Sequence, residues 1–551
     1  MKKIGLLSSL ILMASFLFAQ NIDEGKKFLN YERFESSQKI FKQLLAANPN
    51  DVDAAYWLGQ TYLQNSDDPD SLAAKDLYQK TLQANPNNAL LMVGVGQIEL
   101  MEGKLADARN RFETAINLTK KKDLPGILLA VGRANVDAKK GDAMYAIEKL
   151  TQAADRDKKN DEIQLELGDA YRKMIDGANA TIAYQSALAL NPNNARASFM
   201  IGRIYETQGF GQEPIYMKYY NDAMNEDPKF APVYYWLYNY YYKRDVNKSR
   251  EYLNKYVAVA DNNSKNCYAE ASLLFVSNLY HQAIDKADGC IANAGSAKPY
   301  PNLYGLKAYS YSALGDSLKA KQYFEEFFAK VNPEKIGPMD YSTYAKVLLK
   351  FPGNEQLAAA AVEKAIALDT VPANKVKYVT DVAKSLYDAG RFAEAGKWYT
   401  KVLHLNPNFG VVDLFWAGYS DYRGENYAGA DSVFTVYQQK FPQDMTGWYL
   451  GGRSKEGLDS GALKGLANSD YERVILMADT IANKDSISDK LLPAYRYFVA
   501  YYYNVKGDVA KAAKYNNLIL ILSPTDENAL KNKEPFEKLM RSAAQKGPSK
   551  N

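Results

Sequence analysis

Residues suited to catalysis or metal binding are few in this sequence. Two histidines occur, His281 and His404, and they lie too far apart to form a ligand pair of the H-E-x-x-H type. The stretch from Gly390 to Trp398 approaches a phosphate-binding loop. However, its glycines are one residue too far apart, and Trp398 stands where a serine or threonine would reach magnesium. We therefore predict that the chain is not an enzyme and uses no cofactor or metal.

The composition narrows the class of partner. The chain has 551 residues, of which 47% are hydrophobic, as expected of a folded protein that is too long for one ordinary core. Lys and Arg number 68 and Asp and Glu 64, so no strong basic field exists to attract nucleic acid. Tyrosine is abundant, at 43 residues, and its apolar ring and polar tip suit binding surfaces.

The N-terminus has the layout of a secretory signal. Lys2 and Lys3 precede an apolar run over residues 4–18, and Ala19 supplies a small residue before a polar stretch. The run is shorter than the roughly 20 residues that span a bilayer, although an uncleaved anchor stays an alternative. No cysteine follows it, which disfavours a lipoprotein. We predict a signal peptide over residues 1–19, export to the periplasm, and no integral membrane segment after cleavage.

A recurring phrase organises the rest of the chain. Asn-Pro-Asn occurs at residues 48–50, 85–87, 191–193 and 406–408, and weaker versions place prolines 35 to 37 residues apart. Proline cannot continue a helix, so the phrase ends one helical unit and begins the next. Between two such phrases, Leu165, Gly168 and Tyr171 share one helical face, and Ala180, Tyr184 and Ala187 share another.

This alternation of small and large residues in two successive helices resembles the tetratricopeptide repeat, a helix–turn–helix unit of 34 residues. The pattern recurs along nearly the whole chain, in a style similar to exported repeat proteins of Gram-negative bacteria such as Bacteroidetes. The resemblance implies an all-α, right-handed superhelical solenoid of about 13 or 14 units. We expect an N-terminal arm over residues 23–295, a C-terminal arm over 296–535 and a polar tail over 536–551. Prolines between 295 and 340 indicate either a bend or a loop insertion.

The two cysteines fall in one repeat. By repeat phase, Cys267 begins a first helix and Cys290 ends the second helix of the same hairpin, so the antiparallel helices bring them close. Either a disulfide or two buried thiols fits this placement, and export permits the disulfide.

In the tetratricopeptide family, the first helix of each repeat lines a concave groove. The resemblance places twelve residues at groove-facing positions, and about half of the aromatic rings in such helices are expected to be core. They are Tyr56, Phe199, Arg203, Tyr235, Asn239, Tyr242, Tyr309, Phe415, Tyr419, Tyr422, Tyr497 and Tyr501.

These features predict a non-catalytic scaffold or assembly factor of the cell envelope that binds protein or peptide partners in its groove. It would be peripheral to outer-membrane machinery and would bind no nucleic acid. The alternative is a carbohydrate- or peptidoglycan-binding repeat protein, because flat aromatic faces also suit sugar rings.

Overall fold

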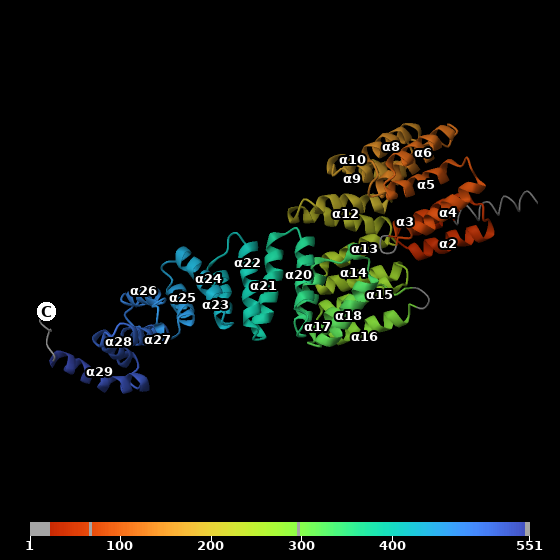
Figure 1. Ribbon diagram of the computed structural model, residues 1–551. Coiled ribbons are helices and arrows are strands. Elements are labelled where there is room, and N and C mark those ends of the chain that lie inside the picture. Colours follow the sequence, from red (N-terminus) through yellow and green to blue (C-terminus); the bar gives the residue numbers. More distant parts are fainter. Residues whose placement is uncertain (1–21, 66–68, 295–297, 546–551) are drawn as a thin grey trace, which may run out of the picture. The chain divides into compact units, whose positions relative to one another are not determined.

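The computed structural model describes residues 22–65, 69–294 and 298–545, and these fold into helices joined by short turns, with no strand among them (Figure 1). The chain divides at Leu306 into two compact units, called unit 1 (up to Leu306) and unit 2 (from Lys307). The sequence pattern predicted the boundary after residue 295, whereas this division lies inside the helix α17 (Asn302–Ala313). Each unit is a row of antiparallel helical hairpins.

Unit 1 begins with the helical segment 22–30, which pairs with α2. Its helices are α2 (Phe34–Ala47), α3 (Val52–Gln64), α4 (Ser71–Ala84), α5 (Ala89–Glu102), α6 (Leu105–Leu118), α7 (Leu124–Asp137), α8 (Ala143–Arg156), α9 (Asp161–Lys173), α10 (Gly177–Leu190), α11 (Ala195–Glu206), η1 (Phe210–Gln212), α12 (Glu213–Glu226), α13 (Ala231–Tyr241), α14 (Val246–Val259), α15 (Ser264–Val276) and α16 (Tyr280–Ala292).

Unit 2 continues with the same hairpin pattern. Its helices after α17 are α18 (Ser317–Lys330), η2 (Pro333–Lys335), α19 (Pro338–Leu348), α20 (Glu355–Leu368), α21 (Pro372–Asp388), α22 (Phe392–Leu405), α23 (Val411–Arg423), α24 (Tyr427–Lys440), α25 (Met445–Leu458), η3 (Ser460–Ala462), α26 (Asn468–Ala478), η4 (Lys484–Ile487), α27 (Ser488–Ala500), the π turn η5 (Tyr501–Val505), α28 (Val509–Leu522) and α29 (Glu527–Gln545). The described residues thus form fourteen hairpins and a final helix, which confirms the predicted all-α solenoid.

The Asn-Pro-Asn phrase both ends and begins helices, as its residue types dictate. Asn191 ends α10, and the side chain of Asn194 accepts a hydrogen bond from the amide of Ala197 in the first turn of α11, at 3.1 Å. A side-chain oxygen at this position satisfies one of the amides that a helix start leaves unpaired. Asp51 and Asn88 cap α3 and α5 in the same way. Each phrase therefore sets the boundary between two hairpins.

A small residue in the first helix receives a large one from the second. A Cβ atom added to Gly168 in α9 would lie 2.3 Å from the ring of Tyr184 in α10, so only glycine admits this ring. Gly59 with Tyr78, and Gly418 with Phe434, repeat the arrangement. Burying each ring between two backbones is what joins the helices of a hairpin.

The last helix extends into the predicted polar tail. The helix α29 runs through Pro535 and ends at Gln545, so residues 536–545 are helical. Phe536, which is 4% exposed, anchors this part of the helix because it packs into the apolar cluster of the last hairpin. The expected signal segment, residues 1–19, and the end of the tail, 546–551, lie outside the described residues.

Candidate functional site

The first helices of the hairpins gather on one side of each unit. In unit 1, α3 contacts α5, α5 contacts α7 and α7 contacts α9, in addition to the contacts within each hairpin. In unit 2, α19 contacts α21, α23 contacts α25 and α25 contacts α27. In a curved stack of hairpins, the helices that approach one another most closely lie on the inner side of the curve. The concave surface is therefore made by first helices.

On α23, a row of aromatic side chains follows this surface. Phe415 and Tyr419 stack with ring centroids 5.2 Å apart and planes 18° apart, and Tyr422 continues the stack at 6.4 Å from Tyr419. Spacings of four and three residues place all three rings on one helical face. All three side chains are half-buried, so each keeps part of its surface open to solvent.

The neighbouring first helices extend this row. The ring of Tyr387 on α21 lies 6.4 Å from that of Tyr419. Tyr449 on α25 packs against the buried apolar cluster that the three rings of α23 also contact. The guanidinium of Arg453, also on α25, lies 5.9 Å from the ring of Tyr422. We call the five aromatic residues Tyr387, Phe415, Tyr419, Tyr422 and Tyr449 the aromatic wall.

The tyrosine hydroxyls of the wall can form hydrogen bonds as uncharged groups. Burial, more than any nearby charge, raises the pKa of Tyr387 and that of Tyr449, so both hydroxyls stay protonated at neutral pH. A phenol can donate and accept one hydrogen bond each, while its ring edge contacts apolar groups. The wall can therefore hold a chain segment that offers apolar side chains and backbone amides.

Some of the other predicted residues in unit 1 form contacts within the protein, and others are open to solvent. The guanidinium of Arg203 lies over the ring of Trp236 at 3.2 Å. The hydroxyl of Tyr242 donates to the carbonyl of Ser272 at 2.7 Å. Tyr235 is half-buried, and Asn239 is exposed. In unit 2, Tyr309 is half-buried and donates to Asp340 at 2.7 Å.

Four predicted groove residues are core residues instead. Tyr56, Phe199, Tyr497 and Tyr501 are 1%, 7%, 3% and 8% exposed. They are buried because their rings fill space between adjacent hairpins. Phe199, for example, contacts Tyr220 and Phe230 at 5.8 Å each. None of the four can line an open groove.

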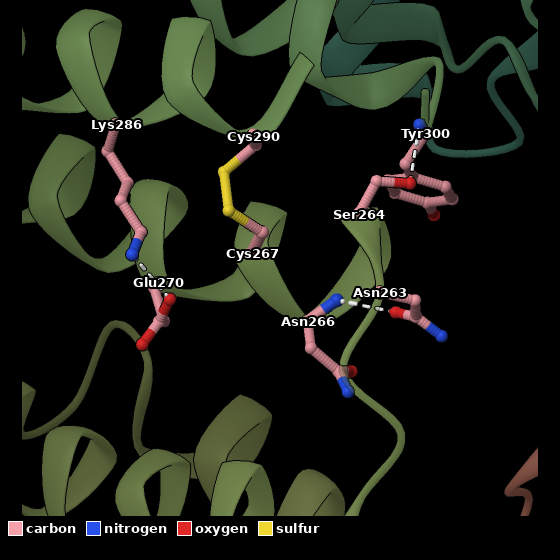
Figure 2. The surroundings of a disulfide bond; sticks show 8 residues. All are labelled: Asn263, Ser264, Asn266, Cys267, Glu270, Lys286, Cys290 and Tyr300. Carbon is pink, nitrogen blue, oxygen red and sulfur yellow. Dashed lines mark hydrogen bonds and ion pairs between the residues drawn. A yellow bond between two sulfur atoms is a disulfide. The ribbon is translucent and has the colours of Figure 1, made fainter. Parts of the chain in front are cut away.

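A disulfide joins the two cysteines within one hairpin. Cys267 in α15 and Cys290 in α16 are bonded, with their Cα atoms 5.7 Å apart (Figure 2). The ammonium of Lys286 pairs with Glu270 at 2.7 Å between the same two helices. The disulfide thus fastens a hairpin of unit 1.

Neither histidine is a member of the aromatic wall. His281 and His404 are exposed on α16 and α22. Among the described residues, no group of three or more His, Cys, Asp or Glu side chains is placed to hold a metal ion. None of the helices in this part of the chain combines the length and apolar character needed to cross a membrane.

Comparison with known proteins agrees with the repeat pattern. A family model described as tetratricopeptide repeat matches residues 22–75, and a second of the same description matches residues 301–328. The chain contains tetratricopeptide repeats. Tetratricopeptide repeat protein 6 of Homo sapiens is 28% identical over 197 residues, which cover 36% of this chain and 36% of that protein. The match therefore spans about a third of the relative's length.

Solved tetratricopeptide-repeat structures also resemble the chain. The C-terminal part of a TPR repeat-containing protein from Cytophaga hutchinsonii is 26% identical and covers 48% of this chain and 98% of that one, with a TM-score of 0.34. Yeast Tom70 is 14% identical and covers 74% and 96%, with a TM-score of 0.35.

Two members of the aromatic wall escaped the sequence analysis, although the tetratricopeptide phase contains them. Tyr387 lies four residues after Ala383, the small residue of its helix, which is a groove-facing position. Tyr449 and Arg453 flank Gly452, which receives the ring of Tyr471 from α26 as the small residue of a further repeat. The phase of that degenerate copy was the signal that could have found them.

Proposed function

We propose that the chain is a non-catalytic scaffold that binds an extended segment of a partner protein along the aromatic wall of unit 2. The observation that carries the proposal is the partly exposed stacked row Phe415, Tyr419 and Tyr422, flanked by aromatic residues of both neighbouring first helices. Rigid aromatic side chains lose little entropy on binding, so a row of them suits the anchoring of a peptide.

The geometry favours a protein segment over a sugar. A sugar ring binds by lying flat on an open aromatic face. Here, Phe415, Tyr419 and Tyr422 turn their faces toward one another, with successive planes 18° and 19° apart. Ring edges and hydroxyls are what such a stack offers to a guest, and these suit side chains and backbone amides.

The proposal assigns no reaction to the chain. Buried carboxylates, which elsewhere serve as catalytic groups, have structural partners here. Asp169 accepts hydrogen bonds from Tyr184 at 2.7 Å and from Arg196 at 2.5 Å. Asp470 accepts a hydrogen bond from Lys455 at 2.8 Å. These bonds hold helices of the solenoid together.

The proposed place of action is the periplasm, next to proteins of the cell envelope. Support comes from the sequence of residues 1–19, in which two lysines precede an apolar run and a small residue. Exported repeat proteins of this style lead us to place the partner within outer-membrane assembly or secretion machinery.

The test is affinity capture from the cell's own envelope with three forms of the tagged chain. These are the unaltered chain, the double variant Tyr419→Ala with Tyr422→Ala, and the control Trp398→Ala. Trp398 is half-buried on α22, a second helix, so its loss removes an aromatic ring of the same unit without touching the wall. We expect one partner to be retained by the unaltered chain and by the control, and lost from the double variant.

Equal retention by all three forms would reject the wall as the binding surface. Retention of glycans on an array, with no protein captured, would favour the carbohydrate alternative instead.

A further inference from the structure

The N-terminal hairpin of unit 1 meets hairpins that follow it by about two hundred residues. The hydroxyl of Tyr31 donates to the carboxylate of Asp227, across a separation of 196 residues. The ammonium of Lys27 lies 3.7 Å from the same carboxylate. Unit 1 therefore curves far enough for its first hairpin to touch the turn between α12 and α13.

A second contact lies at the start of α2. The carboxylate of Asp261 accepts hydrogen bonds from the amides of Glu35 at 2.9 Å and Ser36 at 3.1 Å, and from Nε of Arg33 at 3.2 Å. The residue before α2, Arg33, supplies no side-chain cap of its own. Asp261 therefore caps α2 from the far end of unit 1, and its charge favours the positive end of the helix dipole.

Apolar contact accompanies these bonds. Tyr31 is 3% exposed, and its ring lies 6.1 Å from that of Phe230, which in turn contacts Phe199. The ring of Tyr31 therefore belongs to the core of the α11–α13 region and not to that of its own hairpin.

Beside the N-terminal hairpin lies a hollow of about 600 Å³ that is open to solvent. Residues between 23 and 34 form one of its walls, and Arg133, Glu166 and Arg196 from α7, α9 and α11 contribute to the others. Arg133 pairs with Glu166 at 3.1 Å and with Glu162 at 2.5 Å. The lining of this hollow is thus polar, and the N-terminal hairpin forms one side of it.

The contact of the N-terminal hairpin with Asp227 and Asp261, called the seam, differs from the packing between successive hairpins. On its other side, the N-terminal hairpin is fixed to α3 by apolar packing of Phe41 and Leu44 against Ala54 and Leu58. The seam, by contrast, depends on two aspartates and the ring of Tyr31. Polar contacts exchange for water at little net cost, so the seam is where unit 1 can open without unfolding a hairpin.

We propose that the segment 22–47 is a clasp, held by Asp227 and Asp261, whose release widens the hollow of unit 1. This inference concerns unit 1 and is independent of the aromatic wall in unit 2.

Hydrogen exchange of the full mature chain tests the clasp. The variants are Asp261→Ala, Tyr31→Phe, and the control Asp245→Ala, whose aspartate caps its own helix α14 through the amides of Asn247 and Lys248. In Asp261→Ala, we expect exchange over residues 22–47 to rise about tenfold, as loss of two charge-assisted caps implies. Tyr31→Phe keeps the ring and should raise exchange in the same segment by a smaller factor.

The hairpins at residues 89–190 serve as the internal reference. The proposal requires their exchange to stay unchanged in both clasp variants, and Asp245→Ala to leave residues 22–47 unchanged. An exchange rate over residues 22–47 that neither clasp variant changes would overturn the proposal. An equal rise over residues 89–190 would also overturn it, because it would indicate general destabilisation.

Paired spin labels at Lys39 and Asn254, which are exposed on α2 and α14, give a second measurement that does not depend on exchange. The labelled chain without a clasp substitution should give one narrow distance distribution. Adding Asp261→Ala should introduce longer distances. A broad distribution before any clasp substitution would also overturn the proposal.

Discussion

Replacing Gly168 by a larger residue is expected to destabilise the protein, because the ring of Tyr184 packs directly against the Gly168 backbone. A Cβ atom at residue 168 would lie 2.3 Å from Cε1 of Tyr184, well inside van der Waals contact. The ring is fully buried, and its hydroxyl donates to the carboxylate of Asp169 at 2.7 Å. Gly168→Ala therefore forces the ring away from both the backbone and its hydrogen-bond partner.

The size of the effect follows from three contributions. Overpacking a close-packed core costs about 1–3 kcal/mol. Weakening the bond to Asp169 adds up to about 1.5 kcal/mol, and alanine returns about 1 kcal/mol through its better helix propensity. We expect Gly168→Ala to lower the free energy of unfolding by about 2 kcal/mol.

Gly289→Ala is the matched control. Gly289 lies inside α16, and a Cβ atom added there has nothing within 4 Å. The same substitution should therefore raise stability by about 1 kcal/mol. Urea unfolding followed by circular dichroism gives the sign, and hydrogen exchange over residues 161–190 and 280–292 locates it. A neutral or stabilising Gly168→Ala would refute the packing argument.

Two further predictions concern the disulfide and the charges of unit 1. Replacing Cys267 and Cys290, which are 23 residues apart, by serine should lower the stability of their hairpin by about 3 kcal/mol, seen as faster exchange over residues 264–292. Arg196→Ala leaves Asp169 and Glu166 buried without this partner and should cost about 3 kcal/mol in urea unfolding, whereas Lys218→Ala, from an exposed pair with Asp222, should cost less than about 0.5 kcal/mol.

The local rules of the repeat could be predicted from sequence because each depends on neighbours in the chain. Asn191 and Asn194 end one helix and cap the next through groups three residues away. Gly168 and Tyr184 are joined by a hairpin whose turn sets their register. Short-range contacts of this kind repeat in every unit, so their spacing is visible as periodicity.

The clasp could not be predicted in this way. Asp261 meets Ser36 across 225 residues, and their approach depends on small rotations summed over several hairpins. For the same reason, sequence could not separate Tyr419, which is half-buried, from Tyr501, which is 8% exposed. Both occupy the same position in their repeats, and only the packing of the adjacent hairpins distinguishes them.

Site-specific photo-crosslinking in intact cells tests the central claim most directly. A benzophenone side chain placed at residue 419 keeps an aromatic ring in the wall, and the same group at residue 398 reports on a second helix of the same unit. We predict one protein adduct from residue 419 and none from residue 398. An adduct from residue 398 with none from residue 419 would contradict binding at the concave surface.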